Sequence, residues 1–100
     1  MVDGKINNGV LRICLTGELD DHSAPTMRKQ LDSMIDDRSI KRVVIDMSRL
    51  DFMDSTGIGV LLGRYKKLAA SGVSAFILSP KNNVDKVLNL SGIYKLMPKI

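Results

Sequence analysis

The chain has 100 residues, of which 44% are apolar and 26% are charged, and its formal net charge is +4. These values predict one globular domain over residues 1–100 with a single core. No apolar run reaches the ~20 residues that span a membrane, and the N-terminus lacks a signal-peptide pattern. We therefore expect a cytoplasmic protein without a membrane partner.

The least frequent residue types argue against several kinds of site and partner. Cys14 is the only cysteine and His22 the only histidine, so an intramolecular disulfide is excluded and the usual Cys/His spacing of a metal site is absent. The chain has two tyrosines, two phenylalanines and no tryptophan, and its basic residues form no cluster, which argues against nucleic acid as a partner. We expect neither a metal nor a cofactor.

The N-terminal half predicts two strands and a helix. Residues 5–6 and 10–16 have the pattern of strands joined by an Asn-Gly turn. A polar loop over residues 17–22 follows, and Ser23 fits the N-cap of a helix. The apolar side chains of this helix recur at helical spacing. They are Ala24, Met27, Leu31, Met34 and Ile35.

The sequence in the middle of the chain predicts a further strand followed by a helix. Residues 43–47 form a nearly continuous apolar run, which is typical of a strand buried on both faces, and residues 48–51 have the pattern of a connector. A helix is predicted from Ser55 to about Ala69, with one apolar stripe. The stripe contains Ile58, Leu61, Leu62, Tyr65, Leu68 and Ala69.

The last third predicts one more strand, a helix and a short final strand. Residues 75–78 form the strand, Pro80 opens the helix, and Gly92 ends it. Residues 93–100 have a weaker strand pattern because they include a proline. The predicted order is β-β-α-β-α-β-α-β. Strands that alternate with helices predict an α/β fold with a mixed, mostly parallel sheet.

Ser55 is the most informative position, because it lies between an apolar strand and an amphipathic helix. Asp54 and Ser55 are residue types that cap helices, so capping alone explains them. Alternatively, Ser55 accepts a phosphate, since a helix N-terminus favours an anion and a phosphate there adds roughly −1.5 to −2 charges. The nearby Asp54 would oppose that phosphate.

Two further features near Ser55 allow more than one interpretation. Gly59, Val60 and Gly63 fall opposite the predicted core stripe, either as a bare surface for a partner or as glycines that pack under a neighbouring element. Asp20, Asp21 and His22 form an acidic loop after a strand, either solvated or close to Ser55 at the edge where sites gather in open sheets.

Enzymatic interpretations receive little support. A hydrolase elbow would need a glycine two residues before Ser55, and Met53 stands there. A serine triad would have to use His22, the only histidine in the chain. The glycines after Ser55 lack the Gly-Lys-Ser/Thr ending of a phosphate-binding loop. We therefore expect no enzymatic activity.

Three segments resemble STAS domains, and most of all the anti-sigma-F factor antagonists of sporulating bacteria. They are the Leu-Thr-Gly-Glu-Leu-Asp motif at 15–20, the Val-Val-Ile-Asp-Met strand at 43–47, and residues 52–66 around Asp-Ser-Thr-Gly. The resemblance implies a single STAS domain with helices packed on one side of the sheet. Members commonly continue into a C-terminal helix, which this chain lacks, and they are often acidic.

The resemblance also implies partner switching. The unphosphorylated antagonist binds an anti-sigma factor that is also a serine kinase and so frees the sigma factor. Phosphorylation ends the binding, and a serine phosphatase reverses it. The phosphoserine corresponds to Ser55 and the family's loop aspartate to Asp20, and we expect a monomer when the protein is free. An alternative is a regulatory or scaffold STAS subunit of a general-stress signalling complex. The expected partner-binding residues are Asp20, Asp21, His22, Asp54, Thr56, Gly57, Gly59, Val60 and Gly63.

Overall fold

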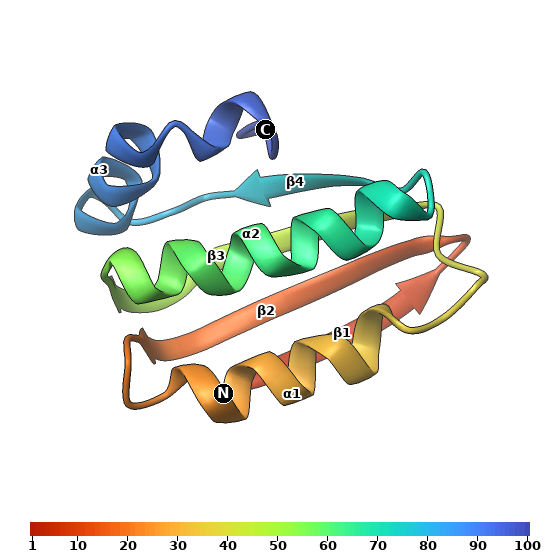
Figure 1. Ribbon diagram of the computed structural model, residues 1–100, viewed down its shortest axis with the longest axis horizontal. Coiled ribbons are helices and arrows are strands. Elements are labelled where there is room, and N and C mark those ends of the chain that lie inside the picture. Colours follow the sequence, from red (N-terminus) through yellow and green to blue (C-terminus); the bar gives the residue numbers. More distant parts are fainter.

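The protein folds as a four-stranded mixed sheet covered by helices, and the computed structural model describes all 100 residues. The strands lie in the order β1-β2-β3-β4, with β1 antiparallel to β2 and the other neighbours parallel (Figure 1). The strands are β1 (Val2–Asn7), β2 (Val10–Leu19), β3 (Arg42–Met53) and β4 (Ser74–Leu78). The helices are α1 (Ala24–Ile35), α2 (Ser55–Ala70), α3 (Asn82–Ser91) and a short 3-10 helix (Ile93–Lys95).

The helices lie on one side of the sheet, as the resemblance implied. Figure 1 shows α1 and α2 side by side across one face, with α3 and the C-terminal segment along the β4 side. A core of 23 apolar residues fills the space between them. The other face carries the half-exposed side chains of Cys14, Val44 and Phe76, and the guanidinium of Arg42 lies 4.3 Å from the centre of the Phe76 ring.

Two strands are longer than the sequence predicts. β2 continues through residues expected in a polar loop, and β3 continues through the expected connector at 48–51. Their parallel pairing extends to Leu19 beside Met53, with register shifts on the way. Pairing uses only backbone groups, so a polar stretch can stay in a sheet when a neighbouring strand runs beside it.

The prediction of a final strand over residues 93–100 is wrong. Residues 93–95 form the short 3-10 helix, and only Lys99 makes a β-bridge, to Ile77. Side chains hold this segment, because Tyr94 donates a hydrogen bond to Asp85 and Lys99 lies 2.9 Å from the same carboxylate. The hydrogen bond from Tyr94 lowers the pKa of Asp85, and burial raises the pKa of Tyr94. The observed order is therefore β-β-α-β-α-β-α followed by a 3-10 turn.

The buried face of α2 is rotated from the predicted stripe. Its buried residues are Gly57, Val60, Leu61, Arg64 and Leu68, whereas Ala69 is exposed. The pattern missed this face because it includes a glycine and an arginine. The side chain of Arg64 is only 9% exposed, and its Nε lies 2.9 Å from the carboxylate of Asp32 on α1, so an ion pair joins the two helices.

Candidate functional site

Helix α2 begins at a junction that Asp54 caps. One carboxylate oxygen of Asp54 accepts hydrogen bonds from the backbone N–H of Thr56, at 3.0 Å, and of Gly57, at 3.3 Å. These are two of the N–H groups that a helix start otherwise leaves without a partner. The capping interpretation is therefore correct for Asp54. The carboxylate already occupies the N–H groups that an anion at this helix end would use.

Ser55 is the first residue of α2 and is exposed. Its hydroxyl takes part in no hydrogen bond within the chain, unlike the carboxylate of Asp54 beside it. The hydroxyl is therefore accessible to another molecule, and removing it breaks no hydrogen bond of the fold.

Gly57 is buried where α2 meets the end of β2. A Cβ atom built at Gly57 would lie 2.6 Å from Cγ of Met53 and 2.9 Å from the carbonyl oxygen of Leu19. Real Cβ atoms do not approach other atoms this closely, so only glycine fits. The predicted partner-binding role of Gly57 is wrong, because its face is covered by the protein itself. Its role is to let the helix start approach the neighbouring strand.

The loop between β2 and α1 is held by its own hydrogen bonds. A carboxylate oxygen of Asp20 accepts from the N–H groups of His22, at 3.0 Å, and Ser23, at 2.9 Å. These backbone bonds from Ser23 and His22 hold the pKa of Asp20 below its ordinary value. Ser23 precedes α1 as expected, but its hydroxyl donates to the carbonyl of Glu18 at 2.7 Å and caps no helix N–H.

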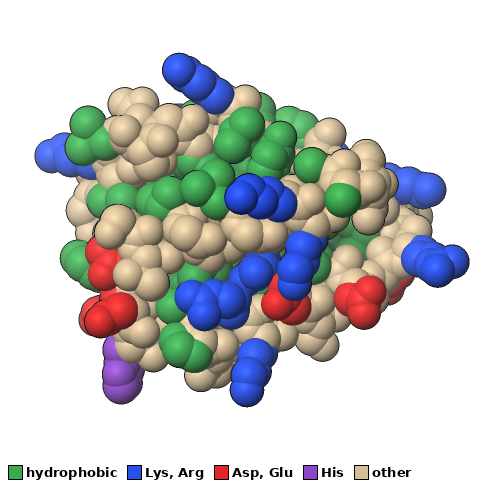
Figure 2. Space-filling model, viewed as in Figure 1, with side chains coloured by type: hydrophobic (Ala, Val, Ile, Leu, Met, Phe, Trp, Pro, Cys, Tyr) green, Lys and Arg blue, Asp and Glu red, His purple; other side chains and the backbone are tan.

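The structure brings this loop and the start of α2 together. The N–H of Asp54 donates to the carbonyl of Leu19 at 3.4 Å, which places Asp20, the next residue after Leu19, beside the Asp54–Ser55 junction. Asp21 and His22 are exposed on the same loop. Figure 2 shows acidic side chains next to the histidine at this end of the molecule. Ser55 thus lies at an acidic end of a protein whose net charge is +4.

Proteins of similar sequence show which family this chain belongs to. A family model described as STAS domain matches residues 1–100. The chain is 39% identical over 92 residues to the anti-sigma F factor antagonist of Paenibacillus polymyxa, covering 92% of this chain and 79% of that protein. The chain belongs to the STAS domain family, among the anti-sigma factor antagonists.

Solved structures agree with this assignment. Unphosphorylated SpoIIAA, an anti-sigma factor antagonist, is 30% identical with a TM-score of 0.78, over 100% of this chain and 88% of that one. SpoIIAA of Bacillus in its phosphorylated form is 29% identical with a TM-score of 0.70, over 100% and 91% of the two chains.

The three expected partner-binding residues on the far side of the predicted α2 stripe divide into two groups. Gly59 is exposed and Gly63 half-buried, and a Cβ atom at either would meet nothing within 4 Å, so the bare strip on α2 exists. Val60 is only 1% exposed and belongs to the core, so its predicted partner role is wrong. The predicted apolar stripe of α2 lies about one residue away from the face that is buried, so Val60 was predicted to point outward.

Phe52, at the end of β3 shortly before Ser55, was not predicted from the sequence to be an exposed residue. Phe52 is 44% exposed, although it belongs to β3 and carries a large apolar side chain. The signal that could have found it is alternation along a strand, since its neighbour Met53 is buried. That signal required β3 to continue through residues 48–51, where the sequence predicts a connector.

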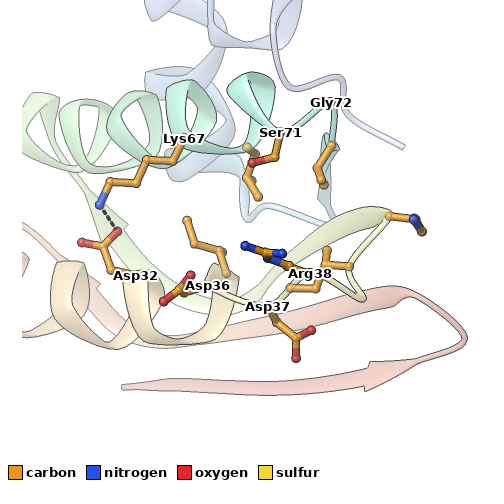
Figure 3. Close-up of a pocket in the computed structure, with 12 residues that line it drawn as sticks. Asp32, Asp36, Asp37, Arg38, Lys67, Ser71 and Gly72 are labelled. Carbon is orange, nitrogen blue, oxygen red and sulfur yellow. Dashed lines mark ion pairs between the residues drawn. The ribbon is translucent and has the colours of Figure 1, made fainter.

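The side chain of His22 makes no hydrogen bond to Ser55, and no group of three or more His, Cys, Asp or Glu side chains could hold a metal ion. A hollow of about 660 Å³ lies at the other end of the molecule between the C-terminal ends of α1 and α2 (Figure 3). No helix in the structure has the length and apolarity needed to cross a membrane.

Proposed function

We propose that this protein acts in the cytoplasm as an anti-sigma factor antagonist switched by phosphorylation of Ser55. In the unphosphorylated state it binds an anti-sigma factor with serine kinase activity, and a serine phosphatase restores that state after phosphorylation. The observation that carries the proposal is the exposed, unbonded hydroxyl of Ser55 at a helix start whose cap is already formed by Asp54. The proposal gives the chain itself no catalytic chemistry.

The electrostatics of the junction support a switch that changes the surface and leaves the fold intact. A phosphate on Ser55 would add roughly −1.5 to −2 charges beside the carboxylates of Asp54 and Asp20. Because Asp54 accepts from the N–H groups of Thr56 and Gly57 in the first turn of α2, we expect the phosphate to point into solvent. A partner that approaches this end would then meet a new charge and a larger group.

The assignment of Ser55 is tested by phosphate mapping. We expect incubation with ATP and the anti-sigma kinase to place one phosphate on Ser55, located by mass spectrometry. Ser55→Ala should abolish the modification, whereas Ser33→Ala, at another exposed serine on α1, should leave it unchanged. Normal phosphorylation of Ser55→Ala would contradict the assignment.

The switch itself is tested by affinity. Ser55→Asp should weaken binding to the anti-sigma factor in calorimetry, because it adds charge and bulk where the partner docks. Light scattering should find the free protein monomeric, whereas stable self-association would favour a scaffold role. Unchanged affinity of Ser55→Asp would count against a switch at this position.

A further inference from the structure

Phe52 extends the surface around Ser55 onto the helix-free face of the sheet. In the register of the parallel strands, Glu18 pairs with Phe52 and Leu19 pairs with Met53. Leu19 and Met53 are buried under the helices, and successive side chains of a strand point to opposite faces. Glu18 and Phe52 therefore lie next to each other on the uncovered face, and both are exposed.

The backbone that carries Phe52 is fixed from the side of α3. The side-chain amide of Asn83 donates to the carbonyl of Asp51 at 2.7 Å, and Nζ of Lys81 lies 2.5 Å from the Asp51 carboxylate. Two contacts thus hold the residue immediately before Phe52. An exposed aromatic side chain on a fixed backbone loses little freedom on binding, which is a property of residues that dominate interface affinity.

The charges around Phe52 indicate what kind of surface fits it. The carboxylates of Asp20 and Asp54 already accept hydrogen bonds from nearby backbone N–H groups. Glu18 and Asp21 are exposed, and their carboxylates have no hydrogen-bond or ion-pair partner in the chain. The unpaired carboxylate of Glu18 beside the Phe52 ring, with that of Asp21 on the loop that follows β2, complements a basic surface that contains an apolar recess.

We propose that Phe52 anchors the anti-sigma factor and that Glu18 beside it pairs with a basic residue of that partner. The docking surface then continues from Ser55 around the end of β3 onto the open face of the sheet. This inference rests on the proposed function, since it names further contacts of the same interaction. It assigns Phe52 to binding alone and gives it no part in phosphate transfer.

The inference is tested by measuring affinity for the anti-sigma factor with Phe52→Ala. We expect the dissociation constant to rise about tenfold or more, as for a central aromatic anchor. The matched control is Ile6→Ala, because Ile6 is similarly exposed, at 41% against 44%, but lies on β1 near the hairpin turn at the opposite end. Ile6→Ala should leave the affinity unchanged. Circular dichroism melting and Phe52→Leu, which keeps an apolar side chain, separate lost contact from lost fold.

The charged half of the inference has its own measurement. Glu18→Gln should weaken binding several-fold at low salt and reduce the dependence of affinity on salt concentration, because one ion pair is lost. Asp3→Asn, at an exposed carboxylate on β1, should change neither value.

The outcomes distinguish this inference from the proposed function. If wild type binds and is phosphorylated on Ser55 while a folded Phe52→Ala binds equally well, the anchor is disproved and the switch stands. If wild type neither binds nor is phosphorylated, both fail.

Discussion

The two strand-to-helix junctions of this STAS domain use the same residue types differently. Before α1, the hydroxyl of Ser23 donates to the carbonyl of Glu18 and accepts from the N–H of Asp20. Before α2, Asp54 caps the helix by itself, and the hydroxyl of Ser55 stays exposed and unbonded.

This difference explains why one junction serves as structure and the other as a candidate switch. Modifying Ser23 would break two hydrogen bonds of its loop. Modifying Ser55 would break none, because Asp54 performs the capping. Ser55 can therefore gain a charge without the loss of a hydrogen bond of the fold, whereas Ser23 cannot.

The largest effect is expected where the two junctions touch. Gly57→Ala should destabilise the protein by about 2 kcal/mol or more, because the added methyl group overlaps Met53 and the Leu19 carbonyl. Gly17→Ala in β2 should cost about 1 kcal/mol, since Gly17 has φ +92° but open space around it. Urea unfolding measures both.

Gly59→Ala is the control for Gly57→Ala on the same helix. A Cβ atom there meets nothing within 4 Å, so stability should stay equal or rise by up to about 1 kcal/mol through helix propensity. If Gly59→Ala lost as much stability as Gly57→Ala, that result would contradict the importance of the close contact between Gly57 and Leu19.

A smaller effect is expected from the cap of α2. Asp54→Ala should cost about 1 kcal/mol, because the N–H groups of Thr56 and Gly57 lose their acceptor. Asp54→Asn keeps an oxygen acceptor and should recover most of that loss. The same urea titration tests both variants, and equal stability of Asp54→Ala and wild type would disprove the cap.

The comparison of the two serines gives the most direct prediction. Ser23→Ala should lower the free energy of unfolding by about 1 kcal/mol through its two lost hydrogen bonds. Ser55→Ala should stay within about 0.5 kcal/mol of wild type, as for a surface substitution away from any contact. Thermal melts of the two variants check this order of stabilities. A Ser55→Ala variant less stable than Ser23→Ala would contradict the structural distinction between the junctions.

The smallest effect concerns acid. The folded-state pKa of Asp20 lies below its ordinary value of 3.8, so its hydrogen bonds contribute stability above that pH. This contribution should fade as pH falls through 3.8 toward the lower folded-state pKa. Asp20→Asn should flatten the acid limb of the stability curve, although Asp37, Asp46 and Asp85 have lowered pKa values too. The control is Asp21→Asn, which removes a carboxylate from the same loop but no hydrogen bond, and Asp20→Asn should flatten the limb more than this control does.

Much of the fold was predictable because its signals are local. The Asn-Gly turn appears as a hairpin with positive φ at Asn8 and Gly9, and Gly92 ends α3 in the left-handed conformation. The extra length of β3 and the final bridge at Lys99 were not predictable, because pairing with a neighbouring strand decides them. Phe52 was missed for the same reason.

By itself the sequence determined the order of strands and helices as far as α3, most of the apolar core, and the position of Ser55 between a strand and a helix. Periodicity and capping act within a few residues along the chain, so these features follow from local chemistry. Only the tertiary structure decided that Gly57 is packed against Leu19, that Val60 is buried, and that the Ser55 hydroxyl is free. Those facts depend on contacts between residues far apart in the chain, which form only when the helices pack on the sheet.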